Sequence, residues 1–378
     1  MHRLLREAAG ERQAVILNRF VFANGSDYAN FRKNMTTADG PVTWLQGAAG
    51  REVKLPVASH GASLFKAKLG EANPASFRCG ELRRVVSPFI PVASHRALWR
   101  RRAEISFMQA RAVSGTQPRN IKIKGRETGF VYEDEYARYC HLSGIYPENL
   151  KASRSVQARD VFETMKSALE EQGFAFADTV RTWFALNRLL EWYEEFNHVR
   201  TTFFEENDVF VKMVPASTGI DAANQFGAAI ICNLLAIQPK TSRLKIQSVL
   251  SPRQGSALNY QSSFSRAVEL AFPTHRCLLV SGTASIAKDG KSAHAGNPAL
   301  QIGLTMRVVE ALLRSRNMDW NDLFRGIAYF KNMDDRIYLD KYCGDHNIPA
   351  FSLAVAHLDL CRKDLLFEIE VDAVKIAE

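Results

Sequence analysis

A single carboxylate near the end of the chain, Glu368, is the best candidate for a proton-transferring group. It lies in the apolar run 365–374, whose composition predicts a final strand. Because side chains alternate along a strand, the apolar residues share one face and Glu368 lies on the other, together with Glu370. That face could line a cleft, where burial raises the pKa of a carboxyl and makes it a general acid at neutral pH. The alternative is a solvated strand face, which we expect Glu370 to occupy.

A lone cysteine and a strand end add to the candidate chemistry. Cys361 lies seven positions before Glu368, but no His stands beside it in the pattern of a nucleophilic cysteine, and a small buried apolar role is the alternative. The run 281–283, Ser-Gly-Thr, ends an apolar strand, so the backbone at Gly282 and the hydroxyl of Thr283 could bind an anion. A simple turn is the alternative there, with Gly282 permitting close approach of another group.

The elements that carry these residues belong to a layout that occurs twice, in residues 157–188 and 301–332, at a constant offset of 144 positions. Each copy has a helical stripe of apolar residues, a break at Gly173 or Asn317, and a short apolar strand. Four positions are identical in the two copies: Gln157/Gln301, Leu169/Leu313, Asp178/Asp322 and Arg181/Arg325. One supersecondary unit therefore occurs twice, and two related halves are predicted.

These copies predict an α+β fold of two tandem halves, each a mixed sheet with helices on one face. In each half the predicted order is strands, helix, strand, helix and strand. We predict an irregular N-terminal extension over 1–60, a divergent first half over 61–242, and a second half over 243–378 that carries the site. The first-half position equivalent to Glu368 falls near Ile231, so one site per chain is expected.

Composition restricts the class of protein. No run within the 378 residues approaches the ~20 apolar residues that cross a bilayer, so no membrane partner is expected. The six cysteines are scattered without a CxxC pair, which is typical of reduced thiols and favours a cytoplasmic location. The histidines lack ligand-like spacing, and no phosphate-binding or dinucleotide-binding motif occurs, so neither a metal nor a cofactor is predicted.

Part of the net charge of +9 is concentrated in a basic segment between residues 95 and 126. A nucleic-acid-binding surface is one interpretation. The segment lacks the interleaved aromatic residues of a base-stacking surface, so we favour a solvated face that guides a small anion.

Several stretches, taken together, have the pattern of a known family. They are the strand 279–284 with Gly290, Gly296 and Gln301 after it, the passage 322–325, the pair Pro349-Ala350 and the ending 363–370. These stretches resemble the Rid/YjgF superfamily, also called the endoribonuclease L-PSP or chorismate-mutase-like fold. Two such halves in one chain most resemble the chorismatases, on Arg181-Thr182-Trp183, Tyr193-x-x-Phe196-Asn197-x-x-Arg200, Ser251-Pro252-Arg253-Gln254, Phe264-Ser265-Arg266-Ala267 and the stretch 359–368.

The resemblance implies a cofactor-independent hydrolase that splits chorismate into pyruvate and a hydroxybenzoate or a dihydroxycyclohexadiene carboxylate. A carboxylic acid, here Glu368, would protonate the methylene carbon of the enol ether, and a cysteine at position 361 marks the class that aromatises its product. Such a substrate carries two carboxylates, which planar guanidinium groups bind well. The candidates are Arg266, Arg253, Arg181 and Arg200, with Tyr260 as a hydroxyl donor. A surface or interdomain ion pair is the alternative for each arginine, and the repeat favours it for Arg181.

Two other functions stay open from the sequence. One is a Rid-type enzyme that acts on another unstable keto acid, enamine or imine, for example in a ring-forming step of natural-product biosynthesis. The other is a nucleic-acid-binding Rid relative without enzymatic activity, which only the basic segment supports. Because Rid relatives are commonly trimers, a homotrimer that binds a small anionic carboxylate is expected.

Overall fold

The computed structural model describes residues 14–23, 42–46, 89–90, 105–114, 116–224 and 226–376. Its N-terminal part contributes a four-stranded sheet in the order β2-β1-β4-β3. The strands are β1 (Ala14–Ala23), β2 (Val42–Gln46), β3 (Phe89–Ile90) and β4 (Ile105–Ser114). Within this sheet β1 pairs with β2 in parallel and with β4 in antiparallel orientation. Arg96 and the basic run 100–102 lie outside the described residues.

The first half of the repeat forms a six-stranded sheet in the order β5-β6-β7-β10-β8-β9. Its strands are β5 (Arg119–Ile123), β6 (Arg126–Glu133), β7 (Ala137–Ile145), β8 (Thr179–Leu186), β9 (Ala216–Asp221) and β10 (Ile230–Pro239). Its helices are α4 (Arg154–Glu170), α5 (Tyr193–Glu206) and α6 (Val209–Lys212). The pair β8 and β9 is parallel and the other adjacent strands are antiparallel, so the sheet is mixed.

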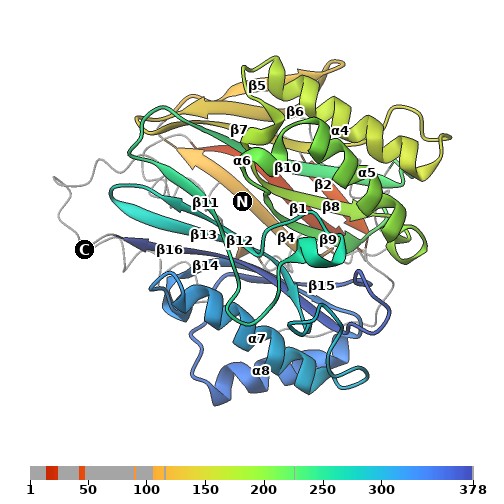
Figure 1. The fold of residues 1–378 in the computed structure, drawn as a ribbon, viewed down its shortest axis with the longest axis vertical. Coiled ribbons are helices and arrows are strands. Elements are labelled where there is room, and N and C mark those ends of the chain that lie inside the picture. Colours follow the sequence, from red (N-terminus) through yellow and green to blue (C-terminus); the bar gives the residue numbers. More distant parts are fainter. Residues whose placement is uncertain are drawn as a thin grey trace, which may run out of the picture.

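The second half repeats this sheet in the order β11-β12-β13-β16-β14-β15. Its strands are β11 (Lys245–Val249), β12 (Ala267–Ala271), β13 (His275–Ala284), β14 (Leu323–Phe330), β15 (Leu353–His357) and β16 (Phe367–Ile376), with helices α7 (Pro298–Arg314) and α8 (Arg336–Asp345). Again one pair, β14 and β15, is parallel. In Figure 1 the helices α4 and α5 lie on one outer side of the molecule and α7 and α8 on the opposite side, with the strands between them.

The predicted order of elements was wrong at one point. Two strands, not one, follow the second helix of each half, because β9 and β15 form the parallel edge of each sheet. The strand β15 has only five residues and three consecutive buried positions, so it lacks the polar alternation that marks a half-buried strand.

The helix starts and stops agree with the sequence pattern in both copies. Ser153 caps α4 by accepting from the Val156 N–H, and Asn297 caps α7 by accepting from Leu300, with Pro298 in the first turn. The predicted breaks at Gly173 and Asn317 both have positive φ, of 75° and 57°. Such left-handed residues end a helix by turning the chain away from it.

The identical glutamine pair of the repeat has one structural task, which is to hold the start of the last strand in each half. The Gln157 side chain accepts from the Ala229 N–H at 2.8 Å, just before β10. The Gln301 side chain accepts from the Leu366 N–H at 2.8 Å, just before β16. The amide of Gln301 also donates to the Asp364 carbonyl at 2.7 Å. The strand that carries Glu368 is therefore tied to the N-terminal part of α7.

The other identical pairs are also equivalent in the structure. The carbonyl of Leu169 accepts from Phe174, and that of Leu313 accepts from Met318, at the corresponding helix ends. Asp178 and Asp322 each accept a backbone N–H three residues earlier. Arg181 and Arg325 lie at matching positions of β8 and β14, and both pair with the same carboxylate, Glu370. The duplication is thus present at the level of individual contacts.

The apolar core explains where the two halves meet. One cluster fills the space between the first sheet and its helices, where Phe162 lies within 5.1 to 6.4 Å of five other phenylalanine rings, measured between centroids. The other cluster includes buried residues of α7 and the second sheet together with Val180, Trp183 and Ile231 of the first half. Since Trp183 and Ile231 belong to that second cluster, the two sheets share an apolar interface.

Among the described residues no helix is both long and apolar enough to span a membrane. The strand β10 ends at Pro239 and β11 begins at Lys245, so the change from one sheet to the other falls between these residues. The domain boundaries given above stay predictions.

Candidate active site

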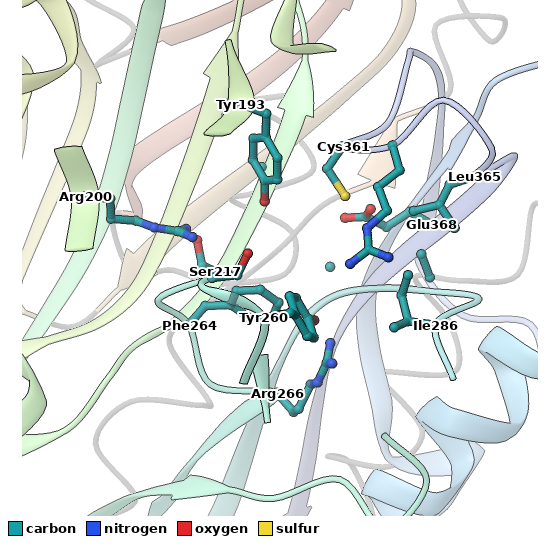
Figure 2. A pocket seen from close by; sticks show the side chains of 15 residues that line it. Tyr193, Arg200, Ser217, Tyr260, Phe264, Arg266, Ile286, Cys361, Leu365 and Glu368 are labelled. Carbon is teal, nitrogen blue, oxygen red and sulfur yellow. The ribbon is translucent and has the colours of Figure 1, made fainter. Parts of the chain in front are cut away.

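A pocket opens where the two halves meet. Its lining comes from α5, β9, the loop before β12, the end of β13, and the loop that leads into β16. The lining residues are Tyr193, Arg200, Ser217, Gly219, Tyr260, Ser262, Phe264, Arg266, Gly282, Ala284, Ile286, Cys361, Arg362, Leu365 and Glu368. Figure 2 shows the hydroxyl of Tyr193, the thiol of Cys361 and the carboxyl of Glu368 facing a common space.

The carboxyl of Glu368 is placed by two neighbouring strands. In β16 this residue lies opposite Ala284 of β13 and Tyr329 of β14. The pairing of β13 with β16 shifts between Val280 and Thr283, so residues 281–282 form a bulge beside it. A Cβ atom at Gly282 would lie 2.0 Å from Glu368 Oε1, which no real contact allows. Glycine at this bulge therefore makes room for the carboxyl.

Burial changes the acidity of this carboxyl. Glu368 is only 4% exposed, and no described residue donates a hydrogen bond to it. Burial, with the negative charge of Glu370 as the next contribution, raises the pKa of Glu368 from 4.5 to about 8, although Arg181 and Arg266 oppose the shift. With a pKa of about 8 the protonated form predominates at pH 7, whereas with a pKa of 4.5 the ionised form would. Glu368 is therefore a protonated acid at neutral pH.

The second carboxylate on the same face, Glu370, is in the opposite condition. Its Oε2 accepts from Arg181 Nη2 at 2.8 Å and from the Thr218 hydroxyl. Its Oε1 accepts from Trp183 Nε1 at 3.1 Å and from Arg325. These four donors occupy the roughly four lone-pair sites of a carboxylate. Burial raises the pKa of Glu370, but the guanidinium groups of Arg325 and Arg181 outweigh burial and leave it below the ordinary value.

The expectation that Glu370 occupies a solvated face was wrong, because this residue is 0% exposed. Its face of β16 packs against β8 of the first half, so both faces of the strand are buried. Two carboxylates two residues apart on one strand thus have divergent environments, one protonated and one ionised. Divergence of this kind is how a fold separates an acid from a charged group.

Guanidinium groups give the pocket a positive wall. Arg200, Arg266 and Arg362 all line it. Nε and Nη2 of Arg266 both donate to the Gly255 carbonyl, at 3.1 and 3.0 Å, which fixes the plane of the guanidinium. The ring of Tyr260 lies between two of these cations, with its centroid 5.5 Å from Arg266 Cζ and 5.3 Å from Arg362 Cζ. Such a wall suits a ligand with more than one carboxylate.

Two neutral side chains complete the space around Glu368. Burial, together with the nearby Glu368, raises the pKa of the Cys361 thiol to about 12, so the thiol is protonated at neutral pH. Burial also raises the pKa of the Tyr193 hydroxyl, which interacts with the deeply buried Arg200. A neutral thiol is a poor nucleophile, which agrees with the absence of a nucleophilic role in the sequence pattern.

The structure brings together six of the nine residues proposed from sequence: Glu368, Cys361, Arg266, Tyr260, Arg200 and Gly282. The other three do not line the pocket. Arg181 is fully buried at the interface with Glu370, Thr283 bonds to the Ser281 carbonyl, and Arg253 is exposed on the surface. Whether the six have the proposed roles stays a prediction.

Sequence reasoning missed several lining residues as site candidates, chiefly Tyr193, Ser217 and Arg362. Arg362 follows Cys361 directly, so its cation beside a candidate residue was the available signal. Tyr193 was named as part of the pattern Tyr193-x-x-Phe196-Asn197-x-x-Arg200, and no local pattern separates a buried helix residue from one that reaches a pocket. Among the described residues no group of three or more His, Cys, Asp or Glu side chains could hold a metal ion.

Comparison with known proteins finds relatives in sequence and in fold. No family model matches the sequence. A 3-hydroxybenzoate synthase from Streptomyces hygroscopicus is 25% identical over 273 residues, which are 65% of this chain and 76% of the relative. A chorismatase from Streptomyces rapamycinicus is 27% identical over 199 residues, 48% of this chain and 57% of the relative. A crystal structure of a chorismatase superposes with a TM-score of 0.60 at 16% identity, covering 95% of this chain and 93% of that one.

The chain is chorismatase-like in sequence and in fold. The predicted fold of this chorismatase-like protein, two tandem halves that are each a mixed sheet with helices on one face, is confirmed by the repeated strand order and the chorismatase superposition. The equivalence of Glu368 with Ile231 is also confirmed by strand register. Glu368 pairs with Tyr329 in β14, and Ile231 pairs with Ala185, at the position of β8 that matches Tyr329.

Proposed function

We propose that this chorismatase-like protein hydrolyses the enolpyruvyl ether of chorismate to pyruvate and a hydroxybenzoate-type product. The observation that carries the proposal is a protonated, buried carboxyl, Glu368, beside a wall of three guanidinium groups. Two of the sequence relatives are a 3-hydroxybenzoate synthase and a chorismatase, which supports the same reaction class. No cofactor is needed for the steps described next.

The proposed reaction begins with proton transfer. Arg266, Arg200 and Arg362 bind the two carboxylates of the substrate and orient its enol ether towards Glu368. The Glu368 carboxyl gives its proton to the terminal methylene carbon, and an oxocarbenium ion forms at the adjacent carbon. The negative carboxylate left on Glu368 stabilises that cation electrostatically. Water captures the cation and returns a proton to Glu368; the resulting hemiketal then releases pyruvate as the ether bond breaks and its hydroxyl proton passes to the ring oxygen. Alternatively the neighbouring ring hydroxyl captures the cation, returns its proton to Glu368 and forms a cyclic ketal. Loss of a ring proton then breaks the bond between that hydroxyl oxygen and the ring, the ring becomes aromatic, and the remaining hemiketal splits into pyruvate and the phenol.

Cys361 is the residue we associate with the hydroxybenzoate outcome. Its protonated thiol lies beside Glu368 in the pocket, where the ring of the substrate would be held. We assign it no covalent bond to the substrate. The small anionic carboxylate is the partner that this site supports, while the homotrimer and the cytoplasmic location stay predictions.

The test is incubation of the protein with chorismate, with pyruvate measured by a coupled dehydrogenase and the aromatic product by chromatography. We expect pyruvate from the wild type and a loss of at least roughly 100-fold in Glu368→Gln, because the amide cannot supply the proton. Glu269→Gln is the matched control, since Glu269 is 3% exposed in β12 and bonds to Gln247 outside the pocket. Wild-type turnover in Glu368→Gln would remove this residue from the mechanism.

The same assay separates the other two functions. A folded protein that releases no pyruvate from chorismate but consumes another keto acid, enamine or imine would be a Rid-type enzyme with a different substrate. A gel shift with RNA that weakens as salt increases would instead support nucleic-acid binding through the basic segment.

A further inference from the structure

The hydroxyl of Thr218 connects the two halves at the point where Glu368 is held. Thr218 lies on β9 of the first half, next to the pocket residue Ser217. Its Oγ1 accepts from Arg181 Nη2 at 2.8 Å and from the Gly282 N–H at 3.0 Å. It donates to Glu370 Oε2.

The hydrogen-bonding capacity of this hydroxyl is fully used. A threonine hydroxyl has one proton and two lone pairs, and here all three are engaged. The direction of each bond follows, because Glu370 is ionised and can only accept, whereas Arg181 and the Gly282 N–H can only donate. No rotation of the hydroxyl satisfies these partners in another way.

The Gly282 N–H matters because Gly282 is in close contact with the catalytic candidate. A Cβ at this glycine would lie 2.0 Å from Glu368 Oε1 and 3.1 Å from Thr218 Cγ2, so the three residues are packed together. A backbone N–H that turned to the Glu368 carboxyl would stabilise its ionised form. The Gly282 N–H instead donates its hydrogen bond to the Thr218 hydroxyl.

The first half has an equivalent glycine but no carboxyl at the position of Glu368. Strand register equates Ile231 with Glu368, Asn233 with Glu370, and Gly144 with Gly282. There the Gly144 N–H donates directly to Asn233 Oδ1 at 2.7 Å, with no intervening hydroxyl. The residue of β15 that matches Thr218 is Ala354, which has no hydroxyl. The hydrogen bond from the glycine N–H to a threonine hydroxyl therefore occurs only beside Glu368, and not at the equivalent described position of the first half.

We propose that Thr218 is a positioning residue for the reaction: its hydroxyl binds the Gly282 N–H and anchors it to the Arg181–Glu370 ion pair, which keeps hydrogen-bond donors away from Glu368 and holds that carboxyl as a proton donor. The proposal rests on the function proposed above. Thr218 itself does not line the pocket, so it acts through Gly282 and Glu370.

The acidity of Glu368 depends on groups from several elements. Those that act on it electrostatically are Glu370 on the same strand, Arg181 on β8 and Arg266 before β12. The charge of Glu368 in turn raises the pKa of three neighbouring groups, Cys361 before β16, Tyr193 at the start of α5 and Tyr329 on β14. Replacing Thr218 by valine leaves all of these in place. A change in the pKa of Glu368 in Thr218→Val is therefore caused by the loss of the threonine hydroxyl.

The experiment compares Thr218→Val with Thr218→Ser and with Thr305→Val. Valine keeps the shape of threonine without the hydroxyl, serine keeps the hydroxyl without the methyl group, and Thr305 is a fully buried threonine of α7 outside the network. We expect Thr218→Val to lower kcat roughly tenfold or more with little change in KM, and to move the alkaline limb of the pH profile at least about one pH unit lower. Thr218→Ser restores the profile, and Thr305→Val retains it.

A second measurement does not depend on the substrate. NMR titration of 13C-labelled glutamate carboxyls, with the Glu368 signal assigned by its loss in Glu368→Gln, reports the acidity of Glu368 in the folded protein. We expect the Glu368 midpoint to move at least about one pH unit lower in Thr218→Val and to stay in place in Thr305→Val. An unmoved midpoint in folded Thr218→Val overturns the inference. Absence of pyruvate release by the wild type overturns the proposed function instead, and the titration is still decisive for Thr218.

Discussion

The replacement of Gly282 by alanine should displace the carboxyl of Glu368, the proposed proton donor, while leaving the fold intact. The added Cβ would lie 2.0 Å from Glu368 Oε1 and 3.1 Å from its Cδ. Ordinary carbon–oxygen contacts begin near ~3.3 Å, so the carboxyl must retreat by roughly 1.3 Å. The obstructing atom is the far end of a flexible side chain, and Gly282 is not among the described glycines with positive φ, so alanine adds no backbone strain.

The expected loss of activity follows from that displacement. A misplacement of about 1 Å can cost roughly 100-fold in rate, or about 2.7 kcal/mol of transition-state stabilisation. We therefore expect kcat for pyruvate release from chorismate to fall roughly 100-fold in Gly282→Ala. The free energy of unfolding should change by no more than about 1 kcal/mol, because the severe clash is with the end of one flexible side chain and Thr218 Cγ2, at 3.1 Å, needs only a small shift.

The assay measures pyruvate release and unfolding by denaturant on the same preparations. Gly344→Ala is the matched control, since Gly344 lies in α8 and a Cβ there has no neighbour within 4 Å. It should keep the wild-type kcat. Folded Gly282→Ala protein that turns over at the wild-type rate would refute the placement of Glu368 against this glycine, and with it the close approach described for the site.

Two further predictions concern acidity and charge. Because the folded-state pKa of Glu368 is raised to about 8, kcat/KM should fall above pH 8 as the acid ionises. The stability that the protonated Glu368 contributes to the fold should be complete below about pH 4.5 and lost by about pH 8. Activity that rises steadily to pH 10 would contradict this. Arg266→Ala should raise KM for chorismate roughly tenfold or more, whereas Arg253→Ala, on the exposed surface, should change it less than about twofold; equal effects would contradict the pocket assignment.

The sequence by itself determined the duplicated scaffold. The strands Thr179–Leu186 and Leu323–Phe330 and the helix breaks at Gly173 and Asn317 follow from local patterns. Such patterns report short-range physics: apolar spacing selects helix or strand, and residues that tolerate positive φ end a helix. Glu368 was also found in this way, because an acid inside an apolar strand is conspicuous without any coordinates.

Only the tertiary structure decided which charged groups share the pocket and which are held at the interface. Arg181 and Arg266 were equal candidates for binding a substrate carboxylate from sequence. In the structure Arg181 is paired with Glu370 between the sheets, whereas Arg266 lines the pocket. The partners of Arg181 are 37 and 189 positions away, so no local pattern contains them.

The different fates of Glu368 and Glu370 come from the same cause. Both alternate onto one strand face, which is as far as local geometry extends. The first half covers that face, and Arg181, Trp183 and Thr218 donate hydrogen bonds to Glu370. None of these three residues donates a hydrogen bond to Glu368. Acidity depends on solvation and on nearby charges, and these are set by segments that meet only when the chain has folded.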